Sequence, residues 1–97
     1  MIYVKIHSGM GDTMMAACDE DVLGNTYSGN GARITVSEAF YNGELVPEEI
    51  FVERMGRMTN MNLVGERTVS LAVENGYVSE GCIMEIGGVK HAQVVKL

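Results

Sequence analysis

The sequence predicts an α+β fold: one small domain, residues 1–97, with a mixed or antiparallel sheet and two main helices packed on one face. Three features predict it. Apolar residues alternate with polar ones over 2–7, which is typical of a half-buried strand. Apolar residues then recur at helical spacing in two segments between 47 and 75. Strand-like segments return at 83–86 and 89–97, on either side of a glycine pair.

The first half is expected to begin with a hairpin. A turn at 9–12 follows the first strand, and the apolar stretch at 13–18 is most simply its return strand. Residues 19–24 are expected to form one helical turn, with Asp19 as its N-cap and Gly24 in the closing left-handed position. Beyond it we expect a loop at 29–31, a short strand at 33–36, a turn at 37–41 capped by Ser37, and a tight turn at 42–43.

The two main helices are expected in the second half. A helix over 47–58 is favoured by Pro47, which suits the first helical position, and by an apolar stripe that includes Phe51. Asn62 is expected to cap the second helix, which ends at the Asn75-Gly76 pair. A glycine turn at 87–88 then separates the last two strands.

The net charge of −6 is unevenly distributed along the chain. Residues 1–50 hold two bases and eight acids, whereas residues 51–97 hold five of each. Nucleic-acid binding without sequence preference depends on a basic surface that neutralises phosphates. We therefore expect no non-specific binding to duplex DNA, although a local patch in the second half stays open.

The sequence favours a cytoplasmic location. The longest apolar run has five residues, 14–18, whereas a membrane helix needs about 20, so no membrane association is expected. The first residues do not resemble a secretory signal. Two cysteines far apart in sequence are more typical of free thiols in a reducing compartment than of a disulfide framework.

Five segments that together span nearly the whole chain carry a family resemblance. They are the opening YVKIH, AACDEDVLG at 16–24, ITVSEAFYNGELV at 34–46, NLVGERTVSLAVENGYV at 62–78 and IGGVKHAQVV at 86–95. These segments resemble an archaeal family of proteins of unknown function, the domain-of-unknown-function family numbered 424. The most specific parts are NLVGE and IGGVxHAQ, and Lys90 departs from the proline expected in many relatives. The resemblance implies an archaeal source, a small cytosolic protein without established activity, and a role near translation or RNA.

Candidate catalytic and metal-binding residues are few. A thiolate–imidazole pair or a zinc site would have to come from Cys18, Cys82, His7 and His91. Cys18 follows two alanines, which favours packing as a small apolar residue, and the four residues lack the close spacing of structural zinc sites. The acids at 19–21 are more typical of helix capping than of a magnesium or calcium site. We therefore predict no catalytic residue, no metal and no cofactor.

Six polar residues in or beside the two most specific segments are the candidates for a binding surface. Their side chains are of the kinds that contact base edges, sugar hydroxyls and peptide backbone. The candidates are Asn60, Asn62, Arg67, Lys90, His91 and Gln93. Alternation along the last strand places His91 and Gln93 on one face, where we expect Arg67 or Asn62 to join them.

Three functions remain open, and the sequence favours a non-enzymatic protein. The first hypothesis is a binding module that docks on RNA or on a protein of the translation apparatus. The second is a small enzyme that uses Cys18 or His91. The third is a homo-oligomeric structural protein that associates through exposed methionines, with an oligomeric state the sequence does not define.

Overall fold

The structure, a computed structural model, describes residues 1–9 and 11–96. Met10 in the expected turn and Leu97 in the expected last strand lie outside the described residues. In chain order the elements are β1 (Ile2–Gly9), β2 (Asp12–Asp19), the 3-10 turn η1 (Glu20–Val22), β3 (Thr26–Gly29), β4 (Ala32–Thr35), α1 (Glu38–Tyr41), β5 (Glu44–Val46), α2 (Glu48–Met55), β6 (Asn60–Val64), α3 (Glu66–Glu74), the 3-10 turn η2 (Glu80–Cys82), β7 (Met84–Ile86) and β8 (Val89–Val95). The predicted α+β class is confirmed.

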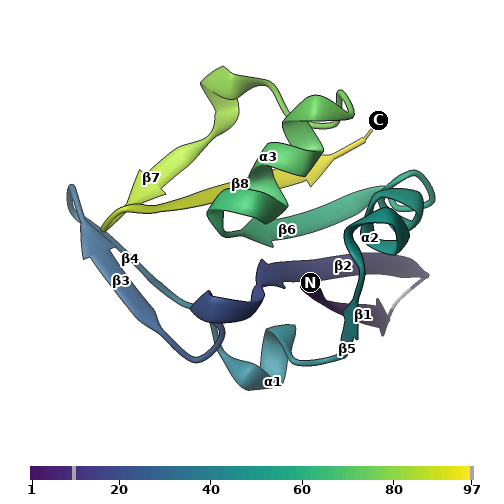
Figure 1. Cartoon of the computed structure of the whole chain (residues 1–97), viewed down its shortest axis with the longest axis horizontal. Helices are drawn as coiled ribbons and strands as arrows, with labels where there is room; N and C mark the ends of the chain where they lie inside the picture. The colour runs from purple at the N-terminus through teal and green to yellow at the C-terminus, as the bar shows by residue number, and fades with distance from the viewer. Residues whose placement is uncertain (10, 97) are drawn as a thin grey trace.

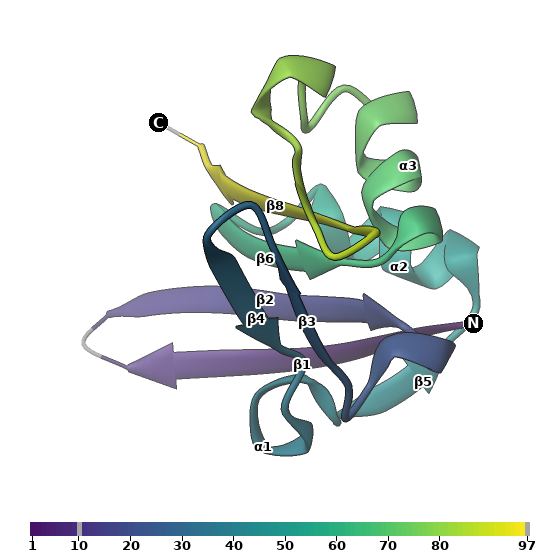
Figure 2. The same cartoon turned by 90° about the vertical axis from the view of Figure 1, so that its left-hand side faces the viewer.

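Six of the strands form one mixed sheet in the order β5-β1-β2-β6-β8-β7. Neighbouring strands are antiparallel except β2 and β6, which are parallel. The main helices α2 and α3 cover one face of this sheet, and the β3–β4 hairpin and short α1 lie on the other (Figures 1 and 2). We call these the helix face and the hairpin face.

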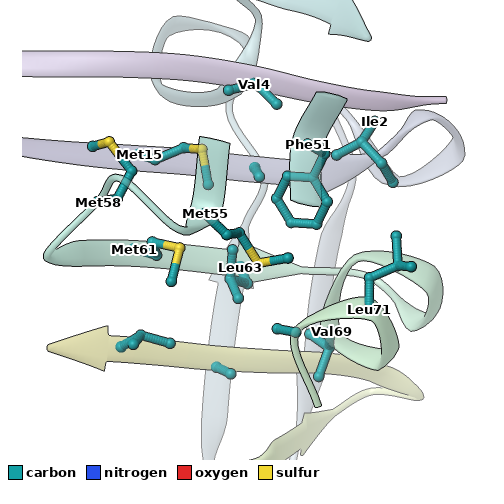
Figure 3. Packing of buried hydrophobic residues seen from close by; sticks show 14 of the residues in the cluster. Ile2, Val4, Met15, Phe51, Met55, Met58, Met61, Leu63, Val69 and Leu71 are labelled. Carbon is teal, nitrogen blue, oxygen red and sulfur yellow. The ribbon is translucent and has the colours of Figure 1, made fainter. Parts of the chain in front are cut away.

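The helix face carries the larger part of the core. Alternate residues of the inner strands, among them Met15 and Leu63, pack against Phe51 and Met55 of α2 and Val69 of α3 (Figure 3). All five are fully buried. A short helix such as α2, with eight residues, is marginal alone, so this packing is its main source of stability.

A second cluster lies on the hairpin face. Cys18 and Val64 of the sheet pack against Tyr41 of α1 and against side chains of the hairpin. At the end of the hairpin, Gly29 and Gly87 come so close that a Cβ on Gly29 would lie 2.8 Å from the Gly87 nitrogen. Two glycines are therefore required where the hairpin touches the β7–β8 turn.

Several expected local structures are confirmed. Antiparallel β1 and β2 form the predicted hairpin, and the Ser37 hydroxyl caps α1 by accepting a hydrogen bond from Phe40 N. The C-terminus of α3 closes as expected at Gly76, which has a φ of 79°, with Tyr77 N donating to Ala72 O at 2.9 Å.

The role expected for Asn62 is wrong. Asn60–Val64 is not a helix start but β6, one of the two central strands of the sheet, and α3 begins after Gly65. Met61 and Leu63 point into the core while Asn62 points to the hairpin face, which is the alternation of a strand. The short strands β3 and β5 were also not expected.

The cap expected at Asp19 belongs to a different helix. Asp19 makes no side-chain cap for the turn η1 that follows it. Its carboxylate instead accepts hydrogen bonds from Arg67 N at 3.0 Å, Thr68 N at 2.7 Å and Thr68 Oγ1 at 2.6 Å. Asp19 thus caps α3 from the end of β2, because the parallel pairing of β2 with β6 brings the two together.

Within the ranges 1–9 and 11–96, no helix is long and apolar enough to cross a membrane.

Candidate functional site

Four of the six candidate binding residues gather on the hairpin face. Asn60 and Asn62 lie on β6, and His91 and Gln93 lie on the adjacent β8. Asn62 is directly opposite Gln93, and Val64 is opposite His91. Because side chains alternate along a strand, all four project to the same side of the sheet.

Arg67 and Lys90 do not join this group. Arg67 lies in the first turn of α3 on the helix face, and its guanidinium donates to both carboxylate oxygens of Glu48, at 2.7 and 2.8 Å. These hydrogen bonds lower the pKa of the Glu48 carboxyl below its usual range. Lys90 also points to the helix face, where its ammonium lies 3.1 Å from Glu66. Of the two residues expected to join His91 and Gln93, Asn62 does so from β6, whereas Arg67 does not.

A cavity of about 460 Å³ opens beside His91 and Gln93, and we call it the hairpin groove. One wall is the hairpin segment 32–34. The other wall comes from the turn η2 and the strands β7 and β8. The second wall is lined by Cys82, Met84, Ile86, His91, Ala92 and Gln93. Volumes of this order are typical of ligand sites.

His91 is held in one orientation at the groove. Its Nδ1 lies 3.1 Å from the carbonyl oxygen of Leu63, which can only accept, so Nδ1 carries a proton. Burial lowers the pKa of the imidazole. The neutral ring therefore has Nε2 as an acceptor, and no described residue donates to it.

Asn62 is partly committed to the fold, whereas Gln93 is open to solvent. The Tyr41 hydroxyl donates to Asn62 Oδ1 at 3.0 Å, and burial raises the pKa of Tyr41 to about 12. Gln93 is exposed and makes no side-chain hydrogen bond to a described residue. Gln93 is thus the member of the group most available to a partner.

Arg33 was not among the sequence candidates, yet it lines the groove from the hairpin. It is exposed, and among the described residues no carboxylate lies within ion-pair distance of it. The signal in the sequence is that Arg33 is one of only two bases in the acidic first half. Arg33 is far along the sequence from the polar segments at 60–67 and 90–93. The sequence alone therefore does not show that the fold brings it close to His91 and Gln93.

The cysteines and histidines are distributed over separate environments. Cys18 is fully buried, as its sequence context predicts, and burial together with the charges of Asp19 and Asp21 raises the pKa of its thiol to about 12. β6 separates Cys18 from His91. A thiol with so high a pKa forms almost no thiolate at neutral pH, so it is a poor nucleophile.

His7 and Cys82, the other two candidates for a zinc site or a thiolate–imidazole pair, lie in different surroundings. His7 stacks on Phe40 with ring centroids 4.5 Å apart, and its Nε2 lies 2.8 Å from the Phe40 carbonyl oxygen. Cys82 is exposed and lines the hairpin groove. In the part of the chain that the structure describes, no three His, Cys, Asp or Glu side chains are placed to hold a metal ion.

Comparison with known proteins adds a family and a solved structure. The family model described as "Protein of unknown function (DUF424)" matches residues 7–97. The crystal structure of an uncharacterized conserved protein from Methanopyrus kandleri superposes with a TM-score of 0.83 and 27% sequence identity, covering 99% of this chain and 93% of that one. None of the curated proteins compared with the chain matched it.

Proposed function

The chain belongs to the DUF424 family of proteins of unknown function, as its sequence segments indicated, and we propose that it is a non-enzymatic binding module of the cytoplasm. The hairpin groove is its contact surface. The observation that carries this proposal is that three polar side chains line the same groove. Gln93 is exposed, His91 is held in one orientation by Leu63, and Arg33 lies on the opposite wall. Polar groups at a partly apolar groove are suited to recognition.

The enzyme alternative has less support. Cys18 is buried with a raised pKa, and the groove holds Cys82 and His91 without a third residue that would orient them as a pair. Association through exposed methionines also has less support, because Met15, Met55 and Met61 serve the core and, among the described methionines, only Met1 and Met84 are exposed.

Of the two expected partner classes, the groove favours a protein over RNA. An RNA site combines several cations with aromatic side chains on which bases stack. The groove contributes one arginine and the imidazole of His91, and its remaining lining is aliphatic, sulfur-containing or amide. Lys90 and Arg67 lie on the opposite face, each beside a glutamate.

The test is affinity purification of the tagged chain from its own cells, with bound protein and RNA both identified. Three forms are compared: the wild type, Arg33→Glu, and the matched control Arg57→Glu. Arg57 follows α2, its side chain is 76% exposed, and it lies away from the groove. Both variants change the net charge equally, so a general charge effect would appear in both.

We expect a protein that co-purifies with the wild type and with Arg57→Glu but is lost with Arg33→Glu, and that survives ribonuclease treatment. Capture that is equal in all three forms would show that the groove is not the contact surface. A partner that disappears after ribonuclease treatment would show that RNA is the primary ligand.

A further inference from the structure

The outer edge of β8 is only partly covered by its neighbour. On its inner side β8 pairs with β6 from His91 to Val95. On its outer side it pairs with β7 only from Val89 to His91. Among the described residues, no strand lies against the outer side of β8 beyond His91.

The backbone groups of Gln93 and Val95 point to this uncovered side. Gly65 N donates to Lys90 O at 2.8 Å, and Lys96 N donates to Thr59 O at 2.7 Å. Even-numbered residues of β8 therefore direct their backbone groups toward β6. Because an antiparallel strand alternates these directions, Gln93 and Val95 direct theirs outward.

The chain before β7 turns away instead of continuing the ladder. Residues 80–82 form the turn η2, where Cys82 N donates to Ser79 O and Ile83 N donates to Glu80 O. The amides of Cys82 and Ile83 are therefore used within the turn and not in a ladder with β8. No described backbone group pairs with the outward groups of Gln93 and Val95.

In the part of the chain that the structure describes, this edge also lacks the usual protection against another strand. Proteins commonly guard an edge with proline, a bulge or a charged side chain. The charged residue that follows Val95 in the chain, Lys96, instead donates to Met55 O at 2.9 Å and lies over the Tyr77 ring. Val95 is 69% exposed. The edge therefore presents unpaired backbone groups together with an apolar side chain.

We propose that this edge binds an extended peptide segment of another protein by strand addition along Gln93–Val95. The added strand directs alternate apolar side chains into the hairpin groove and sets one carboxylate against Arg33. The inference rests on the proposed function and specifies the partner and its mode of binding.

Three observations favour an extended peptide over the other occupants. Unpaired N–H and C=O groups that alternate at the spacing of a strand match a peptide backbone, and an RNA chain does not repeat donors and acceptors at that spacing. The groove beside them is lined by Met84 and Ile86 and has Arg33, without a described carboxylate partner, on its opposite wall. A second copy of this chain would bring another net charge of −6 to the contact, which opposes self-association.

The first experiment is amide hydrogen exchange by NMR with a peptide obtained by selecting a phage library of random twelve-residue peptides on the purified chain. In the free protein, the amides of Gln93 and Val95 exchange fast, whereas those of Ala92 and Val94 are protected by β6. With the selected peptide bound, the amides of Gln93 and Val95 become protected as well.

The second experiment deletes one outward donor. Val95→Pro removes the N–H that points away from β6 and leaves the β6 ladder intact, because proline is tolerated at such edge positions. The matched control, Val95→Thr, keeps both the N–H and the branched side chain. We expect Val95→Pro to weaken the selected peptide by about tenfold or more and Val95→Thr to change its affinity by less than about threefold.

The outcomes separate this inference from the proposed function. A selected peptide that binds while the two amides stay exposed overturns strand addition, and the groove can still be the contact surface. If no peptide can be selected while protein capture still depends on Arg33, strand addition is likewise overturned and the groove remains the contact surface. A concentration-dependent dimer in which Gln93 and Val95 are already protected would assign the edge to a second copy. If Val95→Pro does not fold, the exchange measurement on the wild type still decides.

Discussion

Removal of the Asp19 carboxylate should destabilise the protein more than any other single loss of a surface charge. Asp19 ends β2 and accepts three hydrogen bonds from the first turn of α3. Asp19→Ala removes all three acceptor contacts at once. The Thr68 hydroxyl and amide then lose their partner at a residue that has no solvent exposure.

The magnitude follows from two contributions. Loss of a helix N-cap costs about 1 kcal/mol. Leaving buried donors of Thr68 without an acceptor costs roughly 1–3 kcal/mol more. We expect a loss of about 3 kcal/mol, which corresponds to a fall in Tm of roughly 12–24 °C for a domain of this size. Asp19→Asn keeps one acceptor oxygen for Thr68 but loses the hydrogen bond from Arg67 N and the charge at the helix terminus, so it should cost about 1–2 kcal/mol.

The assay is urea unfolding followed by circular dichroism, with Thr68→Val as a partner variant. The double variant completes a thermodynamic cycle that isolates the contact of Asp19 with the Thr68 hydroxyl. We expect the two single effects to add up to clearly more than the effect of the double variant. An Asp19→Ala protein within about 0.5 kcal/mol of the wild type would refute the capping role.

Three further results are expected. Gly65→Ala should cost at least about 3 kcal/mol in urea unfolding, because Gly65 has a φ of 117° and a Cβ there would collide with the Asp19 carboxylate; a loss below 1 kcal/mol would contradict this. At pH 8, iodoacetamide should modify exposed Cys82 and leave buried Cys18 unmodified until the protein is unfolded, which mass spectrometry can check. Burial lowers the pKa of His91, so below its usual value of 6.5 the unfolded chain takes up the proton more readily and stability falls. The unfolding free energy of the wild type should therefore decline more steeply from pH 7 to pH 5 than that of His91→Gln, and parallel declines would argue against it.

The elements that could be predicted are those with a long or well-delimited pattern. The helix over 47–58 and the closing strand at 89–97 show their periodicity over enough residues to be recognised, and the structure has α2 and β8 there. β6 is only five residues long, and its Asn62 has the side chain of a helix cap. What makes it a strand is its position between β2 and β8, which is a tertiary contact.

The candidate site could be predicted only within single strands. Alternation alone puts His91 and Gln93 on the same side, and the structure keeps them there. Their relation to Asn62 depends on strand register, which a single sequence does not specify. Arg33 reaches the groove only because the hairpin touches the turn at Gly87, a contact between residues far apart in the chain.

The parallel pairing of β2 with β6 has a consequence for synthesis on the ribosome. β1 and β2 are complete by Asp19, but β6 begins only at Asn60, so forty residues must be added before β2 gains its second neighbour. At 5–20 residues per second this takes about 2–8 s. Over that interval Met15 and Ala17, fully buried in the folded protein, lie on a strand with an open edge. Until β6 has been made, this open edge is the part of the emerging chain that a holding chaperone would have to cover to prevent pairing with another strand.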